Sequence, residues 1–175
     1  MLHPENSATV KAAFEKDLED LHLIYDYDAQ NVKTGEPEKW RYEIWIRSSD
    51  RVVYAIHGGP MAGRLNYQKA DYQCIREGEL WQINWLEETG SLVSLCLDLP
   101  QKRITAMIGF SIGHWTQAEQ THGDKRNPED FARWRRLAEM GKQTDRHILY
   151  DQAAILESFR GPGNLQDIDL KAPTL

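Results

Sequence analysis

Apolar and polar residues alternate with a period of two along most of the chain between residues 21 and 112. This is the pattern of β-strands that bury one face, because successive side chains of a strand point to opposite sides. The alternation is clearest over residues 40–47, where one face carries Trp40, Tyr42, Ile44 and Ile46. It recurs over residues 81–88, where one face carries Trp81, Ile83, Trp85 and Glu87. The pattern predicts a series of short antiparallel strands.

Glu87 continues an aromatic face just before a turn at Thr89-Gly90. If this glutamate is buried, loss of hydration raises the pKa of its carboxyl group unless a cation lies beside it. A glutamate at the end of a strand can also turn into solvent, and its position alone does not decide between the two. Glu87 is therefore a candidate acid that needs partners elsewhere in the chain.

Three segments have helical character. Residues 7–20 carry apolar residues at spacings of four, and residues 127–141 begin with a cap, a proline and two acidic residues. Residues 151–159 are predicted to form a last helix. Six or more short strands without intervening helices indicate a mainly β fold, an antiparallel barrel with flanking N- and C-terminal helices. A barrel of about eight strands can hold one small ligand.

We expect a single domain over residues 1–175, since this length is too short for two comfortable domains. Residues 1–20 would form an N-terminal helical extension and residues 21–112 the barrel core. Residues 113–175 would form a loop and helical C-terminal region.

Two further groups could act with Glu87. Tyr25 and Tyr27 lie two residues apart in an alternating segment, so they point the same way. They are either core residues whose hydroxyls reach the surface or two phenol donors that converge on one oxyanion. Arg64 follows the glycine-rich segment HGGPMAGR, and it is either an exposed arginine or a buried one that needs a carboxylate.

Composition excludes several partners and cofactors. The net charge is −6, and the basic residues form no tract, so we expect binding neither to nucleic acid nor to an anionic membrane. No apolar run is long enough to span a membrane and no leader pattern is visible, which indicates a cytoplasmic protein with Cys74 and Cys96 reduced. Phosphate-binding and nucleophile-elbow motifs are missing and the six histidines show no paired spacing, so we expect no cofactor and no metal.

Four segments together resemble one enzyme family: IYDYD (24–28), WRYEIWI (40–46), VYAIHGG (53–59) and INWLEETGSLVSL (83–95). In this order they are similar to the core of the phenolic acid decarboxylases. These cofactor-independent enzymes convert 4-hydroxycinnamic acids to 4-vinylphenols and carbon dioxide. The resemblance implies a flattened, lipocalin-like barrel, a homodimer, and a small phenolic acid such as p-coumaric, ferulic or caffeic acid as the substrate.

The resemblance also implies the site. Its catalytic residues correspond to Tyr25, Tyr27, Arg64 and Glu87. Its substrate-binding residues are expected to be Tyr42, Tyr54, Ile83, Trp85 and Val93. The chain departs from bacterial members of the family in a loop insertion between Tyr27 and Trp40, in Leu65 where tryptophan is usual, and in Glu88 where proline is usual.

Loss of carbon dioxide directly from the acid would leave a vinyl carbanion, whereas a para hydroxyl opens a route through a quinone methide. We expect Glu87, kept protonated by aromatic surroundings, to protonate the alkene carbon while Tyr25, Tyr27 and Arg64 hold the oxyanion end. The orientation of the substrate stays open. Three alternatives also stay open: a barrel that only binds aromatic acids, another cofactor-free lyase, and an interaction module that uses the arginines of residues 133–136.

Overall fold

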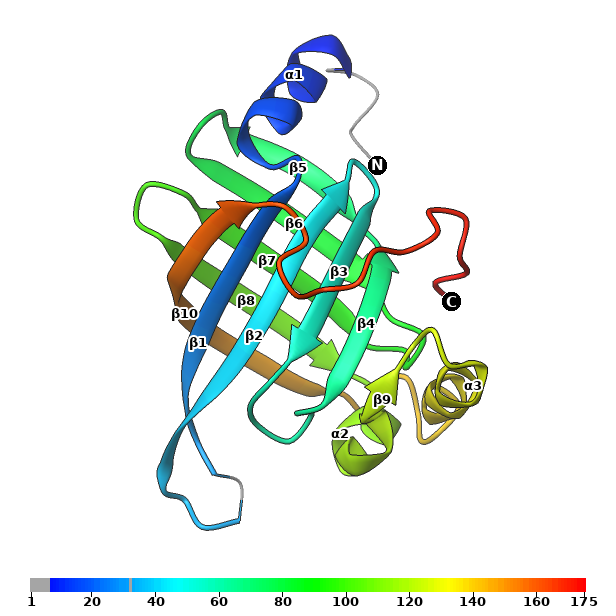
Figure 1. Ribbon diagram of the computed structural model, residues 1–175. Coiled ribbons are helices and arrows are strands. Elements are labelled where there is room, and N and C mark those ends of the chain that lie inside the picture. Colours follow the sequence, from blue (N-terminus) through cyan, green and yellow to red (C-terminus); the bar gives the residue numbers. More distant parts are fainter. Residues whose placement is uncertain (1–6, 32) are drawn as a thin grey trace.

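The computed structural model describes residues 7–31 and 33–175, so residues 1–6 of the predicted N-terminal extension lie outside it. Ten strands in the described residues form one sheet, in the order β5-β6-β7-β8-β10-β1-β2-β3-β4-β9 (Figure 1). Neighbouring strands are antiparallel except for β4 and β9. The strands are β1 (Leu21–Gln30), β2 (Pro37–Ser48), β3 (Arg51–Ile56), β4 (Arg64–Lys69), β5 (Asp71–Arg76), β6 (Leu80–Leu86), β7 (Leu92–Asp98), β8 (Arg103–Phe110), β9 (Gly123–Asp124) and β10 (His147–Arg160).

The sheet curls into a flattened, barrel-like shape. Strands β4 and β5 lie near opposite ends of the sheet, yet only Ala70 separates them in the chain. The sheet must therefore fold back on itself, and in Figure 1 β5, β6 and β7 lie behind β2, β3 and β4. Among the residues that the structure describes, the edge strands β5 and β9 do not pair with each other, so the sheet is open, whereas the strand pattern predicted a sheet that closes on itself. The predicted mainly β, barrel-like fold is confirmed.

Helix α1 (Ser7–Asp17) covers one end of the barrel, as the apolar spacing predicted. The ring of Phe14 packs against Tyr72 and Trp81, with centroid distances of 4.9 and 6.2 Å. Asp17 at the end of the helix accepts a 3.0 Å hydrogen bond from the Trp81 indole. These contacts seal the apolar interior at this end.

The second half of the C-terminal region differs from the prediction. Helix α3 (Pro128–Leu137) is confirmed, with Asn127 as its N-cap, and it follows the short helices α2 (Ile112–Thr116) and η2 (Ala118–Thr121). The predicted helix over 151–159 is wrong, because this segment lies in strand β10 between β8 and β1. Ala153 and Ile155 are buried while their neighbours Ala154 and Leu156 are exposed, which is the period of a strand. Pairing on both sides overrides the helical preference of these residue types.

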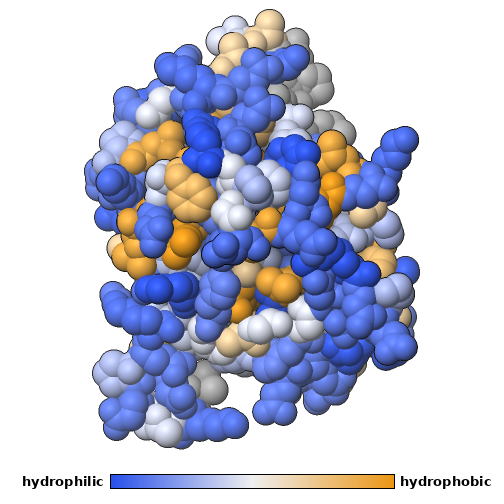
Figure 2. Space-filling model, viewed as in Figure 1, coloured by the Kyte–Doolittle hydropathy of each residue, from blue (hydrophilic) through white to orange (hydrophobic). Residues whose placement is uncertain are grey.

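The outer surface is mostly hydrophilic on the face shown in Figure 2, with apolar residues scattered among polar ones. The C-terminal segment crosses the outside of the sheet, where Leu165 packs against Trp45, Val53, Ala55 and Tyr67.

Cys74 and Cys96 are free thiols. Among the described residues, no helix is long and apolar enough to cross a membrane.

Candidate functional site

A small cavity of about 30 Å³ lies inside the barrel and brings the predicted site residues together. Its lining includes eight of the nine predicted residues: Tyr25, Tyr27, Tyr42, Tyr54, Arg64, Trp85, Glu87 and Val93. The ninth, Ile83, is buried in the core and does not line the cavity. The sequence prediction missed Ile44, Ile56, Met61, Leu95, Ile108, Phe110 and His114.

Three tyrosines form one end of the cavity, which we call the tyrosine end. Tyr25 lies directly opposite Tyr42 in the pairing of β1 with β2, and Tyr27 follows Tyr25 on the same face. The three ring centroids are 5.4 to 5.9 Å apart. Burial raises the pKa of all three hydroxyls well above the usual value, so these groups remain hydrogen-bond donors. The prediction that Tyr25 and Tyr27 point the same way is confirmed.

Glu87 lines the same cavity from the turn that follows β6. The turn is held by a 2.8 Å hydrogen bond from the Glu87 amide to the Ser91 carbonyl, and Gly90 adopts the positive φ of +79° that the turn requires. The carboxyl group is buried, which excludes the solvent-facing alternative.

Four donors surround the Glu87 carboxyl group. The Tyr54 hydroxyl and the Trp85 indole donate to Oε1, the latter over 3.3 Å. Arg64 Nη2 and the Thr89 hydroxyl donate to Oε2 over 3.2 and 3.3 Å. Both carboxyl oxygens act as acceptors in this arrangement. The aromatic surroundings expected from the sequence are present, but a cation lies among them.

Arg64 is fully buried, which excludes the exposed alternative. The glycine-rich segment before it forms a loop in which Gly59 has a φ of +81° and the Gly63 amide donates to the Ile56 carbonyl over 2.8 Å. This loop places Arg64 at the start of β4. Its guanidinium lies 3.9 Å from the centroid of the Trp134 ring of α3 and bonds to both Glu87 and Glu88.

Glu88 forms a second buried ionic group behind Arg64 that the sequence did not predict. Its carboxylate receives Arg64 Nη2 at 2.5 Å and Lys125 Nζ at 2.8 Å, and the amides of Gln68 and Asn66 also donate to it. Burial opposes ionisation, but Arg64 and Lys125 lower the pKa of Glu88 to about 2. Burial lowers the pKa of Lys125 to about 8, against the opposing effect of Glu88. We call Arg64, Glu87, Glu88 and Lys125 the charged end.

His114 of α2 also lies at the charged end and was missed. Its Nδ1 lies 2.9 Å from the Thr89 hydroxyl, 2.8 Å from the Ser91 hydroxyl and 3.7 Å from Glu87 Oε2. Burial, and then the charge of Arg64, lower the pKa of His114 well below its usual value, so the imidazole is neutral. No spacing in the sequence connects position 114 with position 87, because the contact forms only when α2 packs onto the turn.

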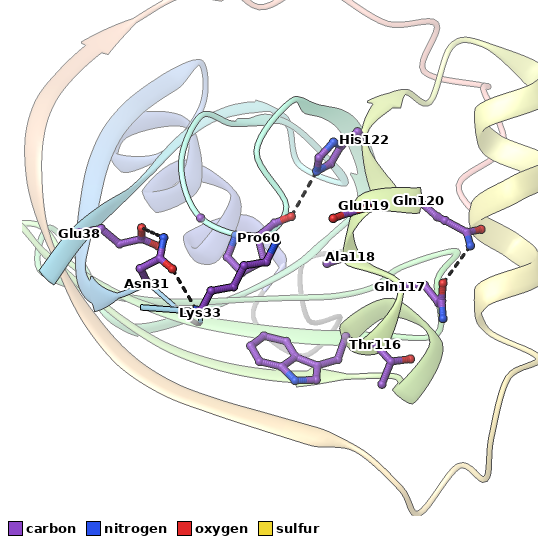
Figure 3. Close-up of a pocket in the computed structure, with 12 residues that line it drawn as sticks. Asn31, Lys33, Glu38, Pro60, Thr116, Gln117, Ala118, Glu119, Gln120 and His122 are labelled. Atoms are coloured by element: carbon purple, nitrogen blue, oxygen red, sulfur yellow. Dashed lines mark hydrogen bonds between the residues drawn. The ribbon is translucent and has the colours of Figure 1, made fainter. Parts of the chain in front are cut away.

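A larger groove of about 710 Å³ lies on the surface nearby (Figure 3). It runs between the β1–β2 connection, Pro60 and the helices α2 and η2, with Lys33, Glu38 and His122 in its wall. Pro60 precedes Met61 of the inner cavity, and Trp115 of the groove follows His114. The groove therefore borders the cavity wall, while Arg64, Glu87 and His114 line the inner cavity.

The described residues contain no group of three or more His, Cys, Asp or Glu side chains placed to hold a metal ion. The cavity lining offers tyrosine hydroxyls, a carboxyl group, a guanidinium and an imidazole. Together they supply proton donors, proton acceptors and groups that can hold an anion.

The comparisons with known proteins identify a family. Residues 17–160 match the family model described as phenolic acid decarboxylase (PAD). Phenolic acid decarboxylase PadC of Bacillus subtilis is 33% identical over 90 residues, which cover 51% of this chain and 50% of that protein. A protein named probable phenolic acid decarboxylase in Vibrio cholerae is 26% identical over 88 residues, 50% of this chain and 45% of that protein. The matched part thus spans about half the length of these relatives. Since the family model covers most of its length, the chain belongs to the phenolic acid decarboxylase family.

Proposed function

We propose that this protein decarboxylates 4-hydroxycinnamic acids, such as p-coumaric, ferulic and caffeic acid, to 4-vinylphenols and carbon dioxide without a cofactor. The observation that carries the proposal is the buried Glu87, bonded to Arg64 in the same cavity as three tyrosine hydroxyls. The relatives named as phenolic acid decarboxylases support the same reaction class.

The cavity lining combines two polar groups, the tyrosine end and the charged end, with apolar walls supplied by residues such as Val93, Leu95 and Ile108. A 4-hydroxycinnamate likewise carries a phenol oxygen at one end, a carboxylate at the other, and a flat apolar body between.

In the proposed orientation, the carboxylate lies at the charged end and the phenol lies at the tyrosine end. A proton donor must reach the alkene carbon next to the carboxylate, and Glu87 is the candidate acid of the charged end. Arg64 can pair with the incoming carboxylate. Tyr25, Tyr27 and Tyr42 stay protonated, so they can donate hydrogen bonds to a phenolate oxygen.

The acid reacts as its phenolate in the proposed mechanism. Electron density flows from the phenolate oxygen to the alkene carbon beside the carboxylate, and Glu87 delivers a proton to that carbon. The quinone methide then loses carbon dioxide, and the electron pair of the broken C–C bond restores the aromatic ring. The phenol gives its proton to solvent before the reaction and the 4-vinylphenolate takes one up afterwards. Glu87 regains its proton from solvent, so each turnover consumes one proton.

The experiment compares p-coumaric acid with cinnamic acid, which lacks the para hydroxyl. We expect the conjugated-acid absorbance of p-coumaric acid to disappear in the presence of the purified protein while cinnamic acid stays unchanged. Equal turnover of both acids would contradict the proposed electron flow. Binding of p-coumaric acid without conversion would indicate a carrier barrel, and conversion of a different hydroxyaryl acid alone would indicate another lyase.

The family resemblance and the sequence also lead us to propose a single-domain protein that forms a homodimer in the cytoplasm. Light scattering of the purified protein at increasing concentration tests the dimer. A mass of 20.3 kDa at every concentration would contradict it.

A further inference from the structure

His114 is a buried imidazole in the cavity wall for which the proposed reaction has no role so far. Only 2% of the residue is exposed, and its ring packs edge-on against Phe110 with a centroid distance of 5.0 Å. On the Nδ1 side the ring is held by two hydroxyls, from Thr89 and Ser91. Ser91 is fixed in turn by the Ser111 amide, which donates to its hydroxyl oxygen over 3.1 Å.

The opposite ring nitrogen is unpaired. Nε2 of His114 is fully buried and has no hydrogen-bond partner among the residues that the structure describes. At the same end of the cavity, Nε of Arg64 is likewise buried without a partner. Buried polar groups are nearly always paired in native proteins, because an unpaired one loses its hydration without compensation. Two unpaired nitrogens beside one cavity indicate a polar ligand atom that belongs there.

The hydroxyl contacts favour the tautomer that carries its proton on Nε2. Thr89 can donate to Glu87 Oε2, whereas the acceptor closest to the Ser91 hydroxyl is Nδ1 of His114, at 2.8 Å. This arrangement satisfies both hydroxyl protons and makes Nδ1 an acceptor. A neutral imidazole with an accepting Nδ1 carries its hydrogen on Nε2. The unpaired nitrogen is therefore a donor, and it requires an acceptor oxygen.

We propose that the Nε2–H group of His114 donates a hydrogen bond to the carboxylate of the bound acid, beside Arg64. This inference rests on the proposed function for the identity of the acid. It adds a substrate-contacting residue to the charged end and gives a reason for the hydroxyl network around Nδ1, which holds the ring in the donating tautomer. A neutral donor suits this position, because the guanidinium of Arg64 already supplies a positive charge there.

The matched variants are His114→Gln and His114→Asn. A glutamine amide can reach the position of Nε2, whereas an asparagine amide reaches only the position of Nδ1. His114→Phe removes both nitrogens and keeps a ring. Melting temperatures and near-ultraviolet circular dichroism of the three variants identify any that fail to fold.

Binding is measured with two ligands that the proposed reaction cannot consume. One is 3-(4-hydroxyphenyl)propanoate, which lacks the alkene, and the other is 4-ethylphenol, which lacks the carboxylate as well. We expect His114→Asn and His114→Phe to weaken binding of the propanoate about tenfold or more, as for a lost hydrogen bond to a charged group. His114→Gln should retain most of the affinity. Binding of 4-ethylphenol should be the same in all folded variants.

If a folded His114→Phe binds the propanoate as tightly as the unchanged protein, the inference is wrong. An equal loss of affinity for both ligands would show a structural role and would also overturn it. Because these measurements need no turnover, they are separate from the proposed function. A protein that binds the propanoate through His114 but leaves p-coumaric acid intact would disprove the decarboxylase reaction alone.

Discussion

The two ends of the cavity are built in different ways. The tyrosine end comes from two neighbouring strands, β1 and β2, and consists of neutral hydroxyls. The charged end combines the start of β4, the turn after β6, helix α2 and Lys125, which are far apart in the sequence. Its Arg64, Glu88 and Lys125 side chains carry charges that are buried and paired. One end is therefore fixed by local strand geometry, and the other depends on the packing of distant segments.

This difference predicts how each end responds to substitution. Removing a neutral hydroxyl from the tyrosine end costs one hydrogen bond, whereas removing one charge from the charged end leaves its partner buried and unpaired. Effects on stability should concentrate at the charged end. Effects on turnover should appear at both ends and be largest at Glu87.

The largest expected effect on activity is that of Glu87→Gln. The amide keeps the size of the side chain but cannot deliver a proton, so we expect kcat for p-coumaric acid to fall about 100-fold or more. Glu79→Gln, at a half-exposed glutamate outside the cavity, is the control and should leave kcat unchanged. Near-normal turnover of Glu87→Gln would remove Glu87 as the proton donor.

Lys125→Met should produce the largest loss of stability. The substitution leaves Glu88 without one of its two cations, and we expect the free energy of unfolding in urea to fall by about 3–5 kcal/mol. The matched control is Lys39→Met, which breaks the exposed pair with Asp28 and should cost less than about 1 kcal/mol. Equal losses of stability in the two variants would contradict the claim that breaking a buried ion pair of the charged end costs more than breaking an exposed one.

Acid should destabilise the protein through Glu88. Its pKa lies near 2 in the folded state and near 4.5 when unperturbed, so the unfolded chain binds the proton first. The stabilisation is fully present above pH 4.5 and is lost as the pH falls towards 2, by about 3 kcal/mol in total. Urea unfolding at several pH values measures this loss. The free energy of unfolding should change much less with pH in Glu88→Gln. An identical pH dependence in both proteins would exclude the Glu88 carboxyl group as the cause of the acid destabilisation.

Tyr27→Phe should have the smallest of these effects. The loss of one hydrogen bond to the phenolate is expected to lower kcat/KM for p-coumaric acid about tenfold, with the fold intact. Tyr72→Phe is the control, because Tyr72 is also buried but its hydroxyl donates to the Arg51 carbonyl. If both variants lose activity equally, the tyrosine end has no special role in the reaction.

The tyrosine end could be predicted from the sequence because its residues follow the period of one strand pair. Alternation in β1 and β2 indicates which side chains share a face, and the cavity contains the tyrosines expected from it. Alternation does not fix depth along the barrel, so Ile83 shares the face of Trp85 yet packs in the core instead of lining the cavity.

The charged end could be predicted only in part. Glu87 and Arg64 each lie next to a glycine-containing turn that can be recognised in the sequence. A buried arginine needs a carboxylate partner, so the sequence also indicated that the two could pair. Glu88, Lys125 and His114 carry no comparable signal. Their contacts arise from the packing of α2 and the segment after it against the turn following β6. Similarly, the strand character of β10 depends on partners that are distant in sequence, and its residue types favoured a helix.

The central position of β10 affects how the chain can be synthesised. Strands β1 and β8 both need β10 as a neighbour, so neither gains its full set of backbone partners until residues 147–160 have left the ribosome. Until then, the nascent chain presents two unpaired strand edges, which are templates for association with other chains. A premature stop shortly before residue 147 should therefore produce an aggregating product, although every residue named for catalysis has already been translated.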